Sequence, residues 1–280
     1  MSDICVCMLV VGGSNYFRAS RQSIRSVLAR SNFDVCIGTD DPDRIRPVSD
    51  RVKRLRLPAP KDPHRAQPFL MKFQSLLACL EHVQSEWIIL MDTDAIFVDT
   101  LTTDTVRDAL AGRGLGMAEQ TTILGSHMTR KEFLDHYIHY SLAWLEPDAP
   151  PPTLNAYRFF NSGVVLGRRS ELHRFATWAL EKATLATRPH QLGEHMIADQ
   201  DYFQFWTNTL HPGCCQTLPW SWNHSSLWDS GFPRSGAHIM HFSNFCHGPR
   251  LAQVLQMTYY RHFYAVSASA AKSSTGTART

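Results

Sequence analysis

Two carboxylates one residue apart, Asp92 and Asp94, follow directly on a run of five apolar residues in the segment EWIILMDTDAIFV. Such a run is typical of a strand that is buried on both faces. Burying two neighbouring carboxylates is costly unless a cation or several hydrogen-bond donors compensate their charge. Carboxylate oxygens suit a hard divalent cation such as Mg²⁺ or Mn²⁺, above all one that also binds phosphate groups. The pair is therefore a candidate metal site at the end of a buried strand.

Three interpretations of this Asp-x-Asp pair are open at this point. In a solvated turn, or at the start of a helix, the pair would hold no ligand. In a phosphohydrolase of the haloacid dehalogenase type, Asp92 would be the nucleophile. That class opens with the pair near its N-terminus and needs a later lysine and a second acidic pair, which are not evident here. In a GT-A glycosyltransferase, the pair would bind a metal that neutralises the diphosphate of a nucleotide sugar.

Strands and helices alternate around the pair. The patterns predict strands at residues 4–11, 33–41, 52–57 and 87–91, with helices at 17–30 and 69–83. In the second helix Phe73, Leu76 and Leu80 recur at helical spacing. Alternation of this kind predicts a parallel α/β sheet, whose ligands bind at the carboxyl ends of the strands.

The second half of the chain is less regular. Consecutive prolines predict a loop at 146–154, FFNSGVVLG predicts a strand at 159–167, and residues 170–183 predict a helix capped by Ser170. Another helix is expected to begin near Asp199. Residues 266–280 have no apolar period and predict a disordered tail, which leaves residues 1–265 as a single domain.

Composition excludes several classes of protein. The 280 residues are 44% hydrophobic and 19% charged, as in ordinary soluble proteins. A net charge of +3 without a dense Lys/Arg block predicts no nucleic-acid partner. The N-terminal apolar run has no cationic lead and is too short for a membrane span, which predicts a cytoplasmic protein. The seven cysteines have no zinc spacing and predict buried free thiols.

Seven short motifs follow one another along the chain: LVVGGSNYF, LMKFQSLL, DTD, FNSGVVLG, ADQDYF, LPWSWNH and HIMHFSNFCHGPR. Their order and spacing resemble the retaining GT-A glycosyltransferases of the glycogenin and bacterial lipopolysaccharide galactosyltransferase family, glycosyltransferase family eight. The order also suits the neighbouring retaining galactosyl- and xylosyltransferases of fungi and plants. The resemblance implies a GT-A fold, with a mixed, mostly parallel sheet flanked by helices, as a catalytic domain over residues 1–265. It also implies a UDP-sugar donor and a Mn²⁺ or Mg²⁺ cofactor.

The resemblance places the donor nucleotide on the first three motifs. The loop in LVVGGSNYF would hold uracil and ribose with Tyr16 near the base, and glycines there allow close backbone approach. Lys72, expected opposite the apolar stripe of its helix, would reach the phosphates. One of the two aspartates would also meet the ribose, while Thr93 contributes mainly backbone. The implied nucleotide-binding residues are Val11, Gly12, Asn15, Tyr16, Lys72, Asp92, Thr93 and Asp94.

The middle motifs are implied to bind the sugars. The amide of Asn161 would bond sugar hydroxyls, and the small residues after it would leave room for the sugar. In ADQDYF the acids would contact donor sugar and acceptor, with the amide close to the reacting carbon. Trp222 is either a platform for a sugar face or a core residue. The implied sugar- or acceptor-binding residues are Arg65, Asn161, Ser162, Gly163, Asp199, Gln200, Trp222 and Asn223, and the catalytic candidates are Asp199, Gln200 and Asp201.

The last motif completes the implied metal site and also departs from the family. His241 would be the third metal ligand beside Asp92 and Asp94, unless it is an ordinary core histidine. Asn244 stands where the family usually has glycine, and no Lys-Pro-Trp follows. His247 or Arg250 would then replace the lysine that binds the β-phosphate.

The expected reaction is metal-dependent transfer of a hexose or pentose from a UDP-sugar to an acceptor hydroxyl with retention at the anomeric carbon. Front-face attack and a short-lived covalent species both remain open. A non-catalytic sugar-nucleotide or glycan-binding protein of the same fold is the alternative. The acceptor is a glycan, a lipid-linked molecule or a protein. Aromatic and cationic residues in 250–266 indicate either a peripheral contact with the inner face of a membrane or a closing helix packed on the domain.

Overall fold

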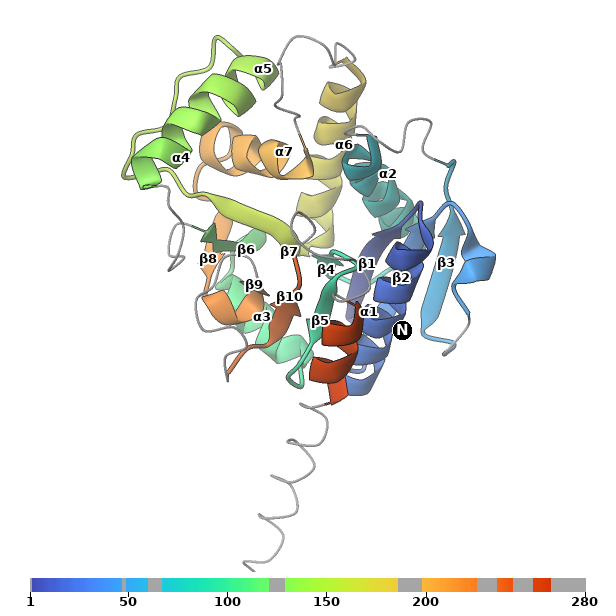
Figure 1. Ribbon diagram of the computed structural model, residues 1–280. Coiled ribbons are helices and arrows are strands. Elements are labelled where there is room, and N and C mark those ends of the chain that lie inside the picture. Colours follow the sequence, from blue (N-terminus) through green and yellow to red (C-terminus); the bar gives the residue numbers. More distant parts are fainter. Residues whose placement is uncertain are drawn as a thin grey trace, which may run out of the picture.

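The computed structural model describes residues 2–46, 49–59, 67–120, 129–185, 198–225, 236–243 and 254–262 (Figure 1). Its strands are β1 Ile4–Val10, β2 Asp34–Thr39, β3 Val52–Arg56, β4 Trp87–Met91, β5 Ala95–Phe97, β6 Leu115–Glu119, β7 Phe160–Arg168, β8 Cys215–Leu218, β9 His224–Ser225 and β10 Ile239–His241. Its helices are α1 Ser14–Arg30, α2 Gln67–His82, α3 Thr103–Leu110, α4 Arg130–His136, α5 Ala143–Leu145, α6 Arg169–Leu185 and α7 Asp199–Phe205. Shorter or irregular helical segments are η1 Pro42–Arg44, η3 Tyr137–Leu142, η4 Trp206–Leu210 and η5 Trp220–Trp222. Residues 254–262 form a further helix.

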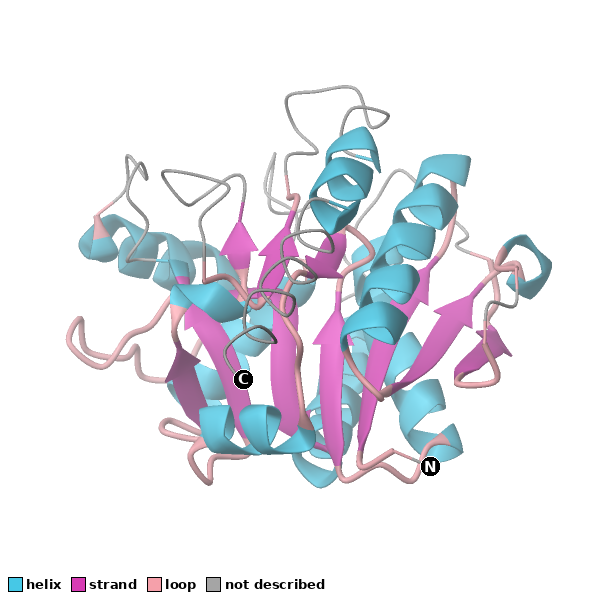
Figure 2. Cartoon of the chain, turned by 90° about the horizontal axis from the view of Figure 1, so that it is seen from below, coloured by secondary structure: helices cyan, strands magenta, loops and turns pink. Residues whose placement is uncertain are grey.

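A seven-stranded sheet in the order β3-β2-β1-β4-β7-β6-β8 forms the centre of the molecule. Strand β7 runs antiparallel to both of its neighbours, β4 and β6, and the other paired strands are parallel. Figure 2 shows these strands side by side with helices in front and behind. The expectation of a mixed, mostly parallel sheet flanked by helices is confirmed.

The two faces of the sheet are covered by different helices, because successive side chains of a strand point to opposite faces. In β1, Ile4 and Val6 pack in one core cluster with residues of α1 and α3. Cys5 and Cys7 pack in the other, with residues of α2, α6 and α7. Figure 1 shows the same division, with α2, α6 and α7 on one side of the sheet and α1 and α3 on the other.

A second, three-stranded sheet in the order β5-β10-β9 lies beside α1 at the carboxyl end of β4. It starts directly after the aspartate pair, and β10 pairs antiparallel with β5 so that His241 lies opposite Ala95. Ser23 on α1 donates its hydroxyl to the backbone oxygen of Thr93 at 2.6 Å, which ties the turn to the helix. The small sheet therefore carries β10 back to the end of β4.

Two helix boundaries differ from the sequence-based expectation. Helix α1 begins at Ser14, so Asn15 and Tyr16 lie in its first turn and not in a loop. Helix α6 begins at Arg169, directly after β7, so Ser170 lies inside the first turn and does not cap the helix. In both places the chain passes from strand to helix within fewer residues than local sequence patterns indicate.

Within the described residues the cysteines are free thiols: Cys5, Cys7, Cys36 and Cys79 are buried, and Cys214 and Cys215 are partly exposed. None of the described helices combines the length and the apolar character that crossing a membrane would require. In the helix at 254–262, Val254 and Met257 pack in the core, whereas Leu255 and Tyr259 are 60% and 61% exposed. This helix closes on the domain and also presents an apolar pair outward, so the predicted membrane contact stays a prediction.

Candidate active site

Asp92 and Asp94 lie in a tight turn between β4 and β5, where the backbone N–H of Ala95 donates to the backbone oxygen of Asp92 at 3.2 Å. Two long-range backbone bonds hold the turn. The backbone N–H of Asp92 donates to the backbone oxygen of Gly163 at 2.8 Å, and the backbone N–H of Phe242 donates to the backbone oxygen of Asp94 at 2.9 Å. The turn is thus fixed by β7 on one side and by the end of β10 on the other.

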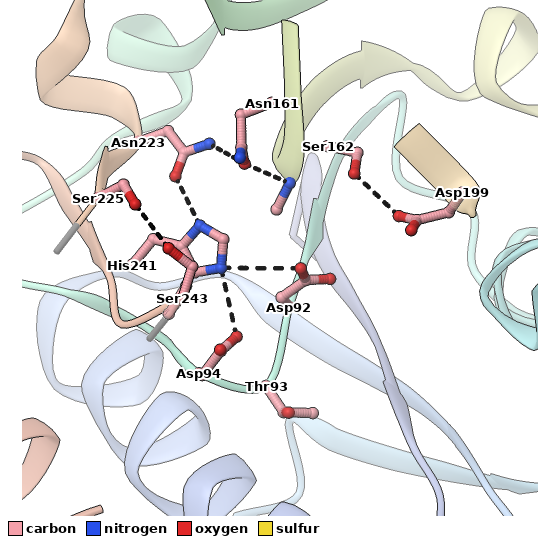
Figure 3. Close-up of polar contacts among 12 residues, drawn as sticks. Asp92, Thr93, Asp94, Asn161, Ser162, Asp199, Asn223, Ser225, His241 and Ser243 are labelled. Carbon is pink, nitrogen blue, oxygen red and sulfur yellow. Dashed lines mark hydrogen bonds and ion pairs between the residues drawn. The ribbon is translucent and has the colours of Figure 1, made fainter. Parts of the chain in front are cut away.

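These bonds bring His241 to the two aspartates (Figure 3). Its Nε2 lies 3.4 Å from Oδ1 of Asp94 and 3.8 Å from Oδ2 of Asp92. Asp94 and His241 are each only 4% exposed, whereas the side chain of Asp92 is 36% exposed. One ligand atom from each of the three residues lies within 4.8 Å of the others. The cluster is buried on the β10 side and open at Asp92.

A chain of hydrogen bonds sets which ring nitrogen of His241 faces the aspartates. The backbone N–H of Gly163 can only donate, so the atom of Asn161 that it meets at 2.8 Å is the amide oxygen. That oxygen also accepts from Nδ2 of Asn223 at 2.7 Å, which leaves Oδ1 of Asn223 facing Nδ1 of His241 at 3.0 Å. An amide oxygen only accepts, so Nδ1 carries the proton and the lone pair of a neutral ring is on Nε2.

Gly163 is the position that admits the imidazole ring. A β-carbon at Gly163 would lie 2.1 Å from Cε1 and 2.5 Å from Nδ1 of His241. The expectation that Gly163 leaves room for a sugar is not what the structure shows, because the histidine occupies that room. Asn161 likewise uses its oxygen to orient Asn223.

Lys72 connects the aspartate turn to α7. Its Nζ lies 2.7 Å from Oδ1 of Asp92 and 2.7 Å from Oδ2 of Asp199, and it donates to the backbone oxygen of Ser162 at 2.8 Å. Burial lowers the pKa of Lys72, but Asp199 and Asp92 outweigh this and hold it above its usual range. The expected placement opposite the apolar stripe is corrected: Lys72 is 5% exposed, and two carboxylates compensate its buried charge.

The donor set fits a divalent cation. Two carboxylates and an imidazole whose lone pair faces them are ligands that Mg²⁺ or Mn²⁺ accepts. Burial, more than its neighbours Asp199 and Asp94, raises the pKa of Asp92, although Lys72 opposes this. Burial lowers the pKa of His241, but Asp94 and Asp92 together raise it above its usual value. Burial is thus the main cause of the shift in Asp92, whereas in His241 the two aspartates outweigh burial.

The three polar residues that begin α7 face different surroundings. Asp199 is buried and accepts from Lys72 and from the hydroxyl of Ser162 at 3.0 Å. Asp201 instead accepts from Ser141 at 2.5 Å and from the backbone N–H of Ala198 at 2.9 Å, and burial raises its pKa. Gln200, which stands between them in the sequence, is half-buried. Asp201 therefore stabilises the start of α7, and Asp199 and Gln200 are the better placed catalytic candidates.

Gln120 was not anticipated from the sequence. It follows β6, is 3% exposed, and accepts a long hydrogen bond from Nε2 of Gln200 at 3.4 Å. Its own Nε2 is buried and has no hydrogen-bond partner. Its position at the carboxyl end of β6 is the signal that could identify it, but β6 is not among the strands that the sequence patterns predict.

The implied nucleotide residues gather at the end of β1. Val11 is buried against Leu57 and Met71, while Gly12 has a φ of +87°, a backbone conformation that favours glycine. Asn15 and Tyr16 are half-buried in the first turn of α1. The end of β1 is adjacent to that of β4, so these residues and the aspartate turn share one edge of the sheet.

Trp222 packs in the core and is 3% exposed, so the structure favours its reading as a core residue over a sugar platform. Asn223, its neighbour, orients His241. Arg65, His247 and Arg250 lie outside the described residues.

Comparison of the sequence with protein families and with curated proteins finds no match. Comparison of structures does find similar folds. One is the crystal structure of mouse xyloside xylosyltransferase 1 in its apo form, with a TM-score of 0.53 and 16% sequence identity. The alignment covers 89% of this chain and 100% of that one. The chain has the GT-A fold. At this identity the likeness concerns the fold, and the chemistry is argued from the site itself.

Proposed function

We propose that the chain is a metal-dependent glycosyltransferase that moves a hexose or pentose from a UDP-sugar to an acceptor hydroxyl with retention of configuration. We place it near the glycogenin and lipopolysaccharide galactosyltransferase family. The observation that carries the proposal is the Asp92, Asp94 and His241 cluster at the carboxyl edge of the sheet in a GT-A fold.

Asp92, Asp94 and His241 would hold Mn²⁺ or Mg²⁺, which supplies Lewis-acid stabilisation of the charge that develops on the diphosphate. The residues around the cluster orient it. Asn223 keeps the lone pair of His241 on Nε2, and Lys72 holds the carboxylate of Asp92. Asp92 is the most exposed of the three ligands, so its side of the cluster is the one from which a donor phosphate would reach the metal.

The beginning of α7 is proposed to face the donor sugar. Lys72 and Ser162 fix the carboxylate of Asp199, which makes it a positioned hydrogen-bond acceptor and a poor nucleophile, since its charge is already neutralised. Gln200 is half-buried beside it and next to Gln120. This arrangement favours front-face attack, with Gln200 close to the reacting carbon, over a covalent intermediate on Asp199.

The test is donor hydrolysis and transfer. The purified chain is incubated with Mn²⁺ and a panel of UDP-sugars, with and without crude glycan, lipid and protein acceptor pools, and UDP release is measured. We expect release with one UDP-hexose or UDP-pentose, its loss on chelation of the metal, and an α-linked product from an α-linked donor by NMR. If no UDP-sugar binds or turns over, the enzyme proposal is wrong.

Binding without turnover would instead support the alternative, a non-catalytic sugar-nucleotide-binding protein. A further arm adds vesicles of anionic lipid, since Leu255 and Tyr259 are exposed on the helix at 254–262. Sedimentation of the chain with vesicles, lost in Leu255→Ser/Tyr259→Ser, would support a membrane-associated acceptor. Absence of sedimentation would contradict the peripheral membrane contact and leave the transferase proposal intact.

A further inference from the structure

Two arginines converge on one buried carboxylate beside the start of β7. The carboxylate belongs to Glu119, the last residue of β6, whose side chain is only 6% exposed. Its Oε1 lies 3.1 Å from Nη2 of Arg130 on α4, and its Oε2 lies 3.8 Å from Nε of Arg158, which precedes β7. Three segments that are separate in the sequence therefore bring their charged side chains together here.

This cluster keeps a surplus of positive charge, because two guanidiniums share one carboxylate. Among the residues that the structure describes, neither Arg130 nor Arg158 forms an ion pair with a second acidic side chain. Residues 121–128, which separate β6 from α4 in the sequence, contain no aspartate or glutamate. The ion pairs compensate the buried charge of Glu119 and leave one cation without a counter-charge.

The guanidiniums are accessible and held in place. The side chains of Arg130 and Arg158 are 39% and 35% exposed. Nη1 of Arg158 donates to the backbone oxygens of Asn155 and Tyr157 at 2.7 and 2.8 Å. The rings of Phe133 on α4 and Phe159 stack with their centroids 4.3 Å apart, which fixes α4 against the start of β7. A positioned guanidinium presents a planar fork of N–H donors that matches the oxygens of a carboxylate or a phosphate.

The cluster also lies close to the proposed place of transfer. Gln120 follows Glu119 directly and accepts from Nε2 of Gln200 at 3.4 Å. Along β7, residues 160–163 connect the strand partner of Glu119 with that of Asp92, a distance of roughly 10 Å. Figure 1 shows α4 over the start of β7, on the same side of the sheet as α7. The diphosphate of the donor would lie at the metal cluster, so a second oxyanion at this distance would belong to the acceptor.

We propose that Arg130 and Arg158 bind an oxyanion, either a carboxylate or a phosphate, on a saccharide acceptor. The chain would then glycosylate acidic saccharides in preference to neutral ones. Sugar acids and sugar phosphates carry the attacking hydroxyl and the oxyanion on one small molecule, which suits a cluster so near Gln200. This inference rests on the proposed function, because it assumes that transfer takes place between the metal cluster and Gln200.

The experiment measures the affinity of the full chain, with Mn²⁺ and UDP, for a set of matched saccharide probes by calorimetry. The probes are methyl glucuronide, methyl galacturonide, the methyl esters of both, the parent neutral hexosides and the phosphate monoesters of these hexosides. We expect an acidic probe to bind about 10- to 100-fold more tightly than its neutral counterpart, the range for hydrogen bonds to a charged group. Comparing uronates with phosphate monoesters identifies which oxyanion the arginines take.

Variants of α4 separate this role from a structural one. Arg130→Gln removes one guanidinium and should reduce the advantage of the acid over its ester by about 10-fold or more. Arg130→Lys keeps the charge without the planar fork and should retain part of the advantage. Lys131→Gln, at the next and exposed position of α4, is the matched control and should leave the advantage unchanged. A purely structural role of Arg130 would weaken the binding of acid and ester alike.

The comparison of acid and ester uses the unaltered chain and needs no variant to fold. If no acidic probe binds more tightly than its neutral counterpart, or if Arg130→Gln keeps the full advantage, the inference is overturned. UDP release from a UDP-sugar in a parallel sample tests the proposed function separately. Release without a preference for acids would overturn the inference alone, whereas a chain that neither binds nor turns over any UDP-sugar would overturn both.

Discussion

Gly163 and His241 are in such close contact that no side chain fits between them: a β-carbon on Gly163 would fall 2.1 Å from Cε1 of the imidazole. The same glycine donates its N–H to Asn161, from which the hydrogen bonds run through Asn223 to Nδ1 of the same imidazole. One residue of β7 thus sets both the position and, through two amides, the tautomer of the histidine on β10.

Gly163→Ala is expected to displace the His241 ring and abolish measurable Mn²⁺ binding. Overpacking at a buried site also costs about 1–3 kcal/mol of stability. Calorimetric titration with Mn²⁺ and urea unfolding measure the two effects. Gly13→Ala is the control, since Gly13 has a φ of −69° and open space around it, and its Mn²⁺ affinity should be unchanged. Unchanged Mn²⁺ binding in Gly163→Ala would show that His241 is not a ligand.

Asn223→Ala removes the acceptor that holds the proton of His241 on Nδ1. Losing such an outer partner of a ligand typically lowers metal affinity about 10- to 100-fold. Asn223→Asp keeps an acceptor at that place and should lose less. Ser225→Ala, two residues further along in β9, removes a hydroxyl that bonds to Ser243 and should leave Mn²⁺ affinity as it is. If the alanine and aspartate variants bind Mn²⁺ equally, the orientation of His241 does not depend on Asn223.

Asp94→Asn removes the charge of the buried carboxylate nearest to Nε2 of His241. Because a divalent cation needs anionic oxygen ligands, Mn²⁺ binding and UDP release should both disappear, while the fold persists by circular dichroism. Asp104→Asn on α3 removes an exposed charge that pairs with Arg107 and serves as the control. UDP release that continues at the wild-type rate in Asp94→Asn would overturn the metal assignment.

Lys72→Met leaves the carboxylates of Asp92 and Asp199 without their shared cation. Breaking a buried ion pair on one side costs about 3–5 kcal/mol of unfolding free energy, measured here by urea denaturation without metal. Adding Asp199→Asn should recover part of the loss, because one of the two stranded charges is removed. The exposed Lys53→Met should change stability by no more than about 0.5 kcal/mol. An additive double variant would show that Lys72 and Asp199 are not coupled.

Asp201 predicts a pH dependence of stability. Burial raises its folded-state pKa above the usual 3.8, so between these two values the folded chain keeps a proton that the unfolded chain has lost. The contribution of Asp201 to the unfolding free energy therefore falls as pH rises through this window and stays low above it. Asp201→Asn carries no charge; its amide oxygen can accept from the N–H of Ala198, and its amide N–H can donate to the hydroxyl oxygen of Ser141. Its stability relative to wild type should therefore increase with pH across the window.

Urea unfolding at a series of pH values measures this difference. The control is Asp148→Asn, an exposed aspartate, whose difference from wild type should not follow the same pH course. A difference between Asp201→Asn and wild type that is constant with pH would show that Asp201 is charged in the folded chain throughout.

Much of the fold followed from local patterns. The apolar run before Asp92 indicated a strand buried on both faces, and β4 is buried along its whole length. The spacing of Phe73, Leu76 and Leu80 indicated a helix, and these side chains are buried in α2. Backbone geometry sets which residues of a helix or strand share a face, so the spacing of apolar residues along the sequence indicates which face is buried. The antiparallel direction of β7 was not predictable in this way, since a buried strand has the same pattern in either direction.

The candidate site, like the fold, was predictable from the sequence only in part. The sequence by itself determined which residues are candidate metal ligands: Asp92 and Asp94 at a strand end, and His241 by resemblance in motif order. Only the tertiary structure decided what surrounds them. It buried Lys72 between two carboxylates, placed Trp222 in the core, and put the ring of His241 over Gly163. These contacts join residues that are far apart in the chain. Residue types and their spacing along the chain do not reveal whether such contacts form.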